Sequence, residues 1–225
     1  MLFPFEAESD VPGERQVTWM TQLALALSYI HLSRVFHRDI KAENVLLSEH
    51  GQIKLVDFGM AAVFESSAAS MAQSKKGTPF YFSPEKADGV GGYDSKSDMW
   101  AAGCILVEIG TGERLLRPIH SDRPEVRQQR EARIEGVGRT TGSALLEEVA
   151  RGLLQFDPKQ RLSGNGMLFL LQAPAAPAGR GQHAAAEAEA RLSEEAAEEE
   201  RAGKEADTPG RCAPAPGHAW ALVCP

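Results

Sequence analysis

The sequence predicts an α+β fold that is mostly helical and carries one short β-hairpin. Three observations predict it. Long stretches repeat apolar residues at helical spacing, most clearly between Glu14 and Leu32. Two short runs of branched apolar residues are separated by a His50-Gly51 turn signal. The chain also has 225 residues, of which 43% are hydrophobic, and this is enough for one domain of ordinary size with extra residues, or for two small domains.

The first helix is predicted from about Glu14 to Leu32, because the Pro12-Gly13 pair breaks the chain just before it. Apolar side chains then recur every three or four residues, so the helix has one apolar face. These side chains are Val17, Met20, Leu23, Ala24, Leu27 and Ile30.

A polar loop around His37 separates this helix from the predicted hairpin. The two strands of the hairpin are Val45–Leu47 and Ile53–Val56, and the turn between them lies at His50-Gly51. A polar, serine-rich segment follows from Glu65 to Lys76. It has no periodicity, which is typical of a mobile surface loop.

The stretch from Asp98 to Ile109 is the most apolar predicted helix, because only Glu108 interrupts it. A helix that is apolar nearly all round is usually central to its domain. An arginine-rich connection is expected after it. Its arginines are Arg114, Arg117, Arg123, Arg127, Arg130 and Arg133.

Two more apolar segments follow: an amphipathic helix from Leu145 to Leu154, ended by Asp157-Pro158, and a short piece from Met167 to Leu171. From Ala173 the composition changes to Ala, Pro, Gly and Glu. We therefore predict two regions. Residues 1–172 form the folded domain, and residues 173–225 form a low-complexity, disordered tail.

Charge and composition exclude several classes of protein. Residues 187–207 supply −6 of the net charge of −7, so the acidity belongs to the tail. The sequence lacks the pattern of basic residues interleaved with aromatic ones that would suggest binding to nucleic acid. Its apolar runs are too short to cross a bilayer. The three cysteines lack metal-ligand or framework spacing, and the first residues do not resemble a signal peptide. We therefore expect an intracellular, cytoplasmic protein, with nuclear or cytoskeletal association left open.

The chemistry lies in the polar stretch His37–Asn44 and in the triplet Asp57-Phe58-Gly59. At this spacing Asp39 can orient an attacking hydroxyl group. Asn44 and Asp57 offer hard oxygen atoms, which suit Mg²⁺ on a nucleotide. Taken alone, the aspartate would be interpreted as a loop-capping residue, so the interpretation depends on its neighbours.

The chain from about Val11 to Leu171 resembles the C-terminal lobe of a eukaryotic protein kinase. Six landmarks of that family occur here in the family's order, which does not plausibly arise by accident. They are His37-Arg38-Asp39 with Lys41 and Asn44, Asp57-Phe58-Gly59, Gly77-Thr78-Pro79, Ser83-Pro84-Glu85, Asp98-Met99-Trp100 with Gly103, and Arg161. The resemblance implies a protein-kinase-like lobe, mostly α-helical, with a short β-hairpin.

The resemblance also implies roles for the polar residues. Asp39 would be the catalytic base that aligns the acceptor hydroxyl, and Lys41 would contact the transferred phosphoryl group. Asn44 and Asp57 would bind Mg²⁺. Leu46 would be the apolar floor beneath the adenine. The residues expected to contact ATP are Lys41, Glu43, Asn44, Leu46 and Asp57.

Other landmarks are implied to be structural. His37 would pack beneath Phe58 and hold the metal-binding segment in place. Glu85 and Arg161 would form a buried ion pair, and losing one partner of such a pair costs about 3–5 kcal/mol. Asp98 would brace the backbone of the catalytic loop. The structural set is therefore His37, Phe58, Gly59, Glu85, Asp98 and Arg161.

Lys41 follows Asp39 by two positions, and Thr78 is placed to hydrogen-bond this pair; both features resemble serine/threonine kinases. The amino-acid sequences of the motifs are similar to those of the NIMA-related branch of protein kinases. In the family, an arginine at the position of Arg38 receives a phosphate from the following mobile segment. Ser74 occupies the matching position, and phosphorylation there is expected to raise activity.

A kinase binds ATP between two lobes, and the upper lobe supplies a glycine-rich loop and a strand lysine. Here no lysine precedes Lys41, and Gly13 is the one glycine before His37. We therefore expect residues 1–172 to be the C-lobe portion of an N-terminally truncated kinase domain, with the N-terminal lobe absent.

Two hypotheses about function follow. The first is a protein serine/threonine kinase that transfers the γ-phosphoryl group of ATP to serine or threonine hydroxyls of proteins. The second is a non-catalytic, kinase-like binding module or inactive fragment. The intact Asp39, Asn44 and Asp57 favour the first, and the missing lysine favours the second. Activity of this chain on its own and its oligomeric state are left open.

Overall fold

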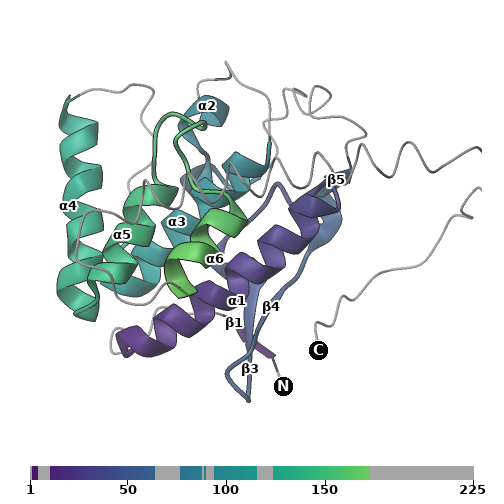
Figure 1. Cartoon of the computed structure of the whole chain (residues 1–225). Coiled ribbons are helices and arrows are strands. Elements are labelled where there is room, and N and C mark those ends of the chain that lie inside the picture. The colour runs from purple at the N-terminus through teal and green to yellow at the C-terminus, as the bar shows by residue number, and fades with distance from the viewer. Residues whose placement is uncertain are drawn as a thin grey trace, which may run out of the picture.

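The computed structural model describes residues 2–4, 11–63, 77–87, 89, 94–115 and 124–172. Within these residues a set of packed helices forms the core, and two small antiparallel sheets lie beside it (Figure 1). The predicted tail over 173–225 and the serine-rich segment lie outside the described residues. The predicted α+β fold, mostly helical with a short β-hairpin, is confirmed.

Helix α1 runs Gly13–Leu32, so the first predicted helix is confirmed to within one residue. Its apolar face is buried, with Leu23, Ala24 and Leu27 at 1% exposure or less. Helix α6, Gly164–Gln172, packs along it (Figure 1). The close approach requires a glycine, because a Cβ atom on Gly164 would collide with Ser28 of α1.

Helix α3, Ser95–Thr111, is the central helix, as its apolar sequence predicts. Asp94 caps its first turn by accepting a hydrogen bond from the Ser97 backbone N–H at 3.2 Å. Gly112 ends it in the left-handed conformation, with φ of 70°. A Cβ atom on Gly103 would lie 2.9 Å from Leu153 and Leu154, so this glycine lets the next helices cross α3 closely.

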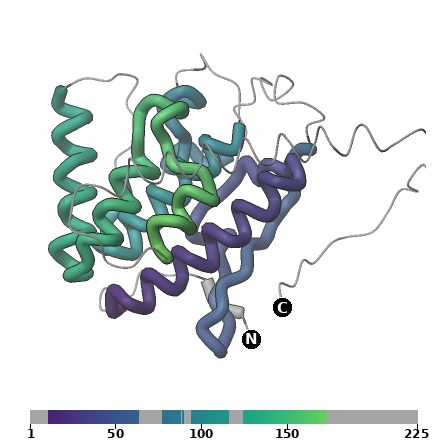
Figure 2. The backbone as a smooth tube through the Cα atoms, viewed as in Figure 1, coloured from purple at the N-terminus to yellow at the C-terminus, as the bar shows by residue number. Residues whose placement is uncertain are grey.

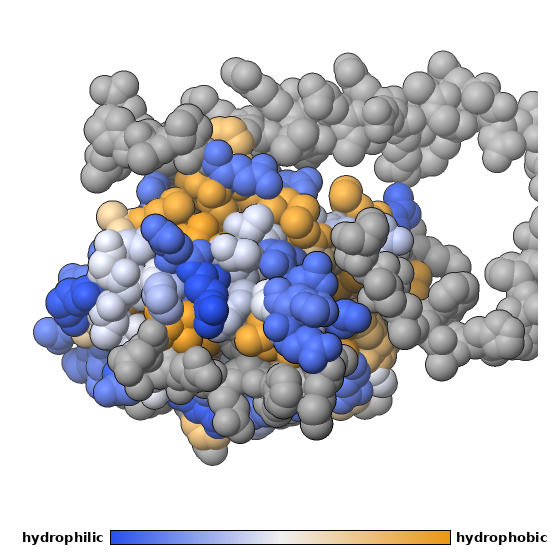
Figure 3. All heavy atoms as spheres, turned by 90° about the horizontal axis from the view of Figure 1, so that it is seen from below, coloured by the Kyte–Doolittle hydropathy of each residue, from blue (hydrophilic) through white to orange (hydrophobic). Residues whose placement is uncertain are grey.

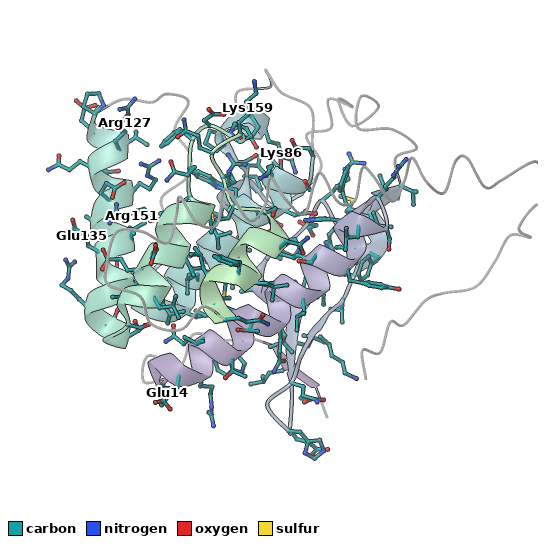
Figure 4. All side chains as sticks on the ribbon, in the orientation of Figure 1. Glu14, Lys86, Arg127, Glu135, Arg151 and Lys159 are labelled. Carbon is teal, nitrogen blue, oxygen red and sulfur yellow. The ribbon has the colours of Figure 1, made fainter. Side chains whose placement is uncertain are left out.

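Helices α4, Pro124–Thr141, and α5, Ala144–Leu153, complete the helical core. Much of the stretch that was expected to be an arginine-rich connection is therefore helix α4, so that prediction was wrong. Among the described side chains of α4 the buried residues are Ile134 and Val137, too few to show a helical period in the sequence. Figure 4 shows the labelled Arg127 and Glu135 pointing outward from α4.

The predicted hairpin is confirmed as strands β3, Val45–Ser48, and β4, Ile53–Leu55. Val45 pairs with Leu55, and Gly51 takes a left-handed φ of 75° in the turn. Strand β1, Leu2–Pro4, joins the other edge of β3 to give the order β1-β3-β4. Figure 2 shows the hairpin as a pair of neighbouring strands below the long first helix.

A second sheet consists of β2, Val35–Phe36, and β5, Ala62–Val63. Strands of two residues are too short for a sequence period, so the sequence did not predict them. The loops that carry the polar motifs contain further short turns of helix. These are η1, Ala42–Asn44; η2, Phe58–Met60; η4, Pro79–Tyr81; and α2, Pro84–Ala87.

The surface of the described residues is mixed rather than uniformly polar. Figure 3 views the molecule from below and shows hydrophobic residues gathered in patches between hydrophilic ones. On α1, Leu25 and Tyr29 are each about half exposed, at 51% and 53%. None of the helices in the described residues has the length and hydropathy that a bilayer crossing requires.

Candidate active site

Asp39 lies in the loop between β2 and η1, and both of its carboxylate oxygens are held. Oδ1 accepts hydrogen bonds from the Thr78 backbone N–H at 3.1 Å and from Thr78 Oγ1 at 3.0 Å. Oδ2 accepts one from Lys41 Nζ at 2.7 Å. Asn44 Nδ2 donates to the Asp39 carbonyl oxygen at 2.8 Å. The structure therefore brings together four residues that lie up to 39 positions apart.

These contacts set the charge of the pair. Burial alone would raise the pKa of Asp39, but the hydrogen bonds from Lys41 and Thr78 outweigh it and hold the pKa below its usual value. The bond to Asp39 raises the pKa of Lys41. At neutral pH the two groups are a carboxylate and an ammonium. This pair can orient a neutral hydroxyl on one side and attract an anion on the other.

Asp98 of α3 fixes the backbone of the same loop. It is fully buried, and it accepts hydrogen bonds from the backbone N–H groups of His37 and Arg38, each at 3.0 Å. Arg38 has a φ of 71°, a left-handed conformation that costs a non-glycine residue about 1–2 kcal/mol. The two bonds from one carboxylate oppose this cost and hold the turn.

His31, at the end of α1, also contacts this carboxylate, with 2.9 Å between its Nε2 and Asp98 Oδ2. This contact was not predicted from the sequence. A histidine in the last turn of a helix has an ordinary explanation in the helix dipole, so nothing in the sequence marks His31 for a second role. The contact attaches the end of α1 to the catalytic loop.

His37 is fully buried beneath the Asp57-Phe58-Gly59 motif. Its Nε2 lies 3.0 Å from the Val56 carbonyl oxygen, and its ring centroid lies 4.7 Å from that of Phe58. Burial lowers the pKa of His37, so the ring is neutral at neutral pH. A neutral ring between β4 and Phe58 is the arrangement that the structural role of His37 requires.

Asp57 follows strand β4 at the open edge of the site. It is exposed and takes a left-handed φ of 62°. Its Oδ1 accepts a hydrogen bond from the Gly59 backbone N–H at 3.3 Å, and a Cβ atom at Gly59 would lie only 3.1 Å from that oxygen. The backbone N–H of Val56 donates to the Asn44 carbonyl oxygen at 2.9 Å, which places Asp57 beside Asn44.

The donors of this pair fit Mg²⁺ rather than a transition metal. The described residues hold no cluster of three or more His, Cys, Asp or Glu side chains that could enclose an ion by itself. Mg²⁺ does not need such a cage, because it keeps several waters and uses one or two carboxylates together with substrate phosphates. Asp57 offers a carboxylate, and Asn44 offers an amide oxygen while its nitrogen is engaged with Asp39.

The other two predicted nucleotide contacts are placed differently from each other. Leu46 is half-buried on β3, opposite Lys54 of β4. Glu43 is exposed, and its carboxylate lies 3.4 Å from the guanidinium of Arg114. A contact between Glu43 and a nucleotide stays a prediction.

A hydrogen-bond network around Glu108 was also not predicted from the sequence. Tyr81 donates a hydrogen bond through its hydroxyl to Glu108 of α3 at 2.7 Å, and Arg114 donates to the other oxygen of Glu108 at 3.0 Å. Burial raises the pKa of Tyr81, and the bond to Glu108 raises it further. Glu108 was visible in the sequence as the one charge inside an apolar helix. Its partners, 27 residues before it and six after, were not.

The predicted ion pair between Glu85 and Arg161 is present, and it involves both oxygens of the carboxylate. Arg161 is 1% exposed and donates to the two oxygens of Glu85 at 2.8 and 2.9 Å. It also donates to the carbonyl oxygens of Lys96 and Gln155. Burial alone would raise the pKa of Glu85, but Arg161 outweighs it and the pKa is lowered. Ser74, the predicted phosphate acceptor, lies outside the described residues.

Known proteins resemble the chain across the region that holds this site. The family model of the protein kinase domain matches residues 5–173. Serine/threonine-protein kinase 36 from Pongo abelii is 35% identical over 166 residues, which are 73% of this chain and 12% of that protein. Serine/threonine-protein kinase Nek9 from Mus musculus is 36% identical over 158 residues, which are 70% and 16%. Nek3 from Mus musculus is 43% identical over 98 residues, which are 44% and 19%.

The chain therefore spans less than a fifth of the length of these three relatives. The serine/threonine type that the motifs predict is confirmed among the relatives. The predicted likeness to NIMA-related kinases is confirmed as well, since several Nek proteins match.

Proposed function

The chain belongs to the protein kinase family, and we propose that it supplies the catalytic-loop lobe of a serine/threonine protein kinase. The reaction is transfer of the γ-phosphoryl group of ATP to a serine or threonine hydroxyl of a protein. The observation that carries the proposal is the Asp39 carboxylate, whose two oxygens are held by Thr78 and Lys41.

The geometry supports a positioning role for Asp39. Its pKa is lowered, so it is an anion at neutral pH and can accept a hydrogen bond from the acceptor hydroxyl. Lys41 then holds an ammonium 2.7 Å from the same carboxylate, next to the place where a phosphoryl group would meet that hydroxyl. In phosphoryl transfer, positioning and charge stabilisation account for most of the catalysis.

Asn44 and Asp57 would hold Mg²⁺ on the ATP phosphates, and Leu46 would lie beneath the adenine. A bound Mg²⁺ would offset the negative charge of the phosphates. Within the chain, Asn44 is aligned by its bond to the Asp39 main chain, and Asp57 by the bond that it accepts from Gly59.

We assign residues 1–172 to the C-terminal lobe of the kinase domain and residues 173–225 to a separate low-complexity tail. A phosphate on Ser74, paired with Arg38, would order the segment that returns at Gly77 and so raise activity. Use of ATP fits the intracellular, cytoplasmic location that the cysteine pattern predicts.

The test supplies the upper lobe with which a protein kinase completes its ATP site. The full 225-residue chain is fused behind the upper lobe of one of the relatives, and phosphate transfer from ATP to a protein substrate is measured with Mg²⁺. The fusion should be active, and Asp39→Asn in it should lower turnover by about 10²–10⁴-fold. Glu135→Gln, at an exposed position of α4, serves as the control and should leave turnover unchanged.

A folded fusion that transfers no phosphate would refute the proposal. An active fusion that tolerates Asp39→Asn would also refute it. Ser74→Ala in the active fusion tests the regulatory part separately, because it should remove the activation by a phosphorylating kinase and leave Asp39 in place.

One observation favours a second candidate, a non-catalytic module that binds an apolar segment of a partner protein. A groove of about 320 Å³ lies between α1 and β4 and reaches Phe58. Leu25 and Tyr29, both half exposed, line it. Binding there needs no carboxylate, so Asp39→Asn would leave partner binding unchanged while Leu25→Glu would weaken it.

A further inference from the structure

Lys86 on α2 is a buried lysine that the proposed reaction does not use. Its residue exposure is 8%, although lysine is almost never buried unless its charge is compensated. Figure 4 labels it on α2, at the opposite end of the molecule from Glu14. It follows Glu85 directly in sequence, yet the sequence alone suggested nothing beyond a surface lysine.

The Lys86 ammonium is enclosed by the segment that carries Thr78. It lies 4.1 Å from the centroid of the Phe82 ring, in the range of a cation–π contact. A Cβ atom on Gly77 would lie 3.0 Å from this ammonium and 2.9 Å from the Arg38 carbonyl oxygen. Gly77, with a φ of 113°, is therefore confined between Lys86 and the catalytic loop.

Gly77 connects Lys86 to the site. The next residue, Thr78, donates two hydrogen bonds to Asp39 Oδ1, one of them through its backbone N–H. A shift of Gly77 would therefore move a donor of the Asp39 carboxylate. Lys86, Thr78 and Asp39 also line one small cavity, together with Arg38 and Phe82.

The charged groups that face Lys86 are Asp98 on α3 and, on the catalytic loop, Arg38 and Asp39. Tyr81 is the other titratable group in the cavity lining, and its raised pKa keeps it neutral. Burial lowers the pKa of Lys86 to about 8, against the attraction of the two carboxylates and with the repulsion of Arg38. The ammonium therefore exists at neutral pH and loses its proton under mildly alkaline conditions.

We propose that Lys86 is a proton-dependent positioning residue, whose ammonium holds Gly77 and Thr78 against Asp39 and releases them when it becomes neutral. The geometric part stands independently of catalysis. The catalytic consequence rests on the proposed kinase function. The cation–π contact with Phe82 requires the charge, so the neutral amine loses it.

The lowered pKa of Lys86 fixes how its burial affects stability as the pH changes. Between pH 8 and the pKa of an unfolded lysine, about 10.4, the unfolded chain binds more protons than the folded chain, so stability rises with pH. Below pH 8 the cost of burying the charge is fully present. An uncharged side chain of similar length should therefore stabilise the fold at pH 7 and yet loosen Thr78.

The experiment follows the Thr78 methyl group by ¹³C NMR in the full chain from pH 6.5 to 9.5. In the wild type the signal should titrate with a midpoint near pH 8. In Lys86→Met it should stay at the high-pH position, and the melting temperature at pH 7 should rise by roughly 2–8 °C. Lys86→Arg, which keeps its charge throughout, should stay near the low-pH position.

The matched control is Lys159→Met, which removes an exposed lysine and should leave the titration unchanged. The proposal is overturned if the Thr78 signal does not move while the Lys86 side-chain signal titrates, or if Lys86→Met titrates like the wild type. If Lys86→Arg does not fold, the Lys86→Met and wild-type curves still decide the question.

The active fusion gives the catalytic readout. Lys86→Met should lower kcat at pH 7 by up to about 10²-fold and leave KM for ATP unchanged, because it displaces a positioning contact and not a nucleotide contact. An inactive wild-type fusion would remove the kinase proposal alone, since the Thr78 titration does not depend on it. An active fusion whose kcat is unchanged by Lys86→Met would refute the catalytic consequence.

Discussion

Asp39 and Asp57 are the two aspartates that the proposed reaction uses, and they differ in burial and in the number of hydrogen bonds that they accept. Asp39 is 8% exposed and accepts hydrogen bonds from Thr78 and Lys41 on both of its oxygens. Asp57 is exposed and accepts one bond, from the next-but-one residue in its own turn. The half of the site proposed to align the acceptor hydroxyl is thus organised by the chain itself. In the half that would bind the metal, Asn44 is buried but the Asp57 carboxylate is open to solvent.

The difference has a physical cause. A group that orients a neutral hydroxyl works best when its own geometry is fixed beforehand. Mg²⁺ keeps several of its waters when it binds to a protein, so a carboxylate that binds it is best placed where water can reach. The following changes test whether the two halves are independent, and they are ordered by the size of the expected effect.

The largest effect should come from the buried support of the first half. Arg161→Met leaves the Glu85 carboxylate buried without its partner and should lower the free energy of unfolding by about 3–5 kcal/mol, measured by urea denaturation. The double variant Glu85→Gln with Arg161→Met should recover part of this loss. Equal losses in the single and double variants would show that the ion pair itself is not the source.

Breaking the Asp98 brace should come next. Asp98→Asn keeps one acceptor but sets an amide N–H₂ against a backbone N–H, so we expect a loss of about 1–3 kcal/mol in unfolding free energy. The Asp39 half should loosen and the Asp57 turn should not. Amide hydrogen exchange measures both, and faster exchange at Gly59 than at Arg38 relative to wild type would contradict the separation.

A smaller effect is expected from Thr78→Val, which removes one hydrogen bond to Asp39 and keeps the shape of the side chain. We expect about 1–2 kcal/mol at neutral pH. The folded pKa of Asp39 lies below its unfolded value of about 3.9, so this stabilisation is present above that value and is lost as pH falls through the folded pKa. Denaturation at pH 7 and at pH 2.5 should show the difference between wild type and variant shrinking in acid.

The smallest perturbation is the addition of Mg²⁺ alone. NMR signals of Asp57 and Asn44 should shift with weak, saturable affinity, and the Thr78 methyl signal should stay in place. Asp57→Asn should remove the shifts, and Ca²⁺ provides the comparison cation. A shift of Thr78 as large as that of Asp57 would show that the two halves are coupled.

The same contrast separates what the sequence could predict from what it could not. Asp39 and Asn44 were assigned from motif spacing, Lys41 and Thr78 were assigned from the resemblance to protein kinases, and the four lie together. Helix α1 was assigned from its apolar period and the hairpin from its two apolar runs and turn signal, and their bounds agree closely with the structure. Local patterns and ordered motifs therefore carry their own information.

The rest depends on partners that no local pattern names. His31 contacts Asp98, 67 residues away, and Tyr81 contacts Glu108, 27 residues away. Helix α4 buries too few apolar side chains to show a period. Lys86 resembles any solvated lysine until the structure encloses it. These contacts depend on the tertiary structure, and they involve residues outside the His37–Asn44 loop.

The Asp98 carboxylate has one more consequence. Because it accepts hydrogen bonds from the backbone of the loop and contacts His31 of α1 at once, it holds the loop by its main chain and not by the loop's own side chains. In the proposed kinase, residues that select one protein over another could therefore change during evolution without disturbing phosphate transfer. The Asp98 contacts would thus let the same phosphoryl transfer act on different protein substrates.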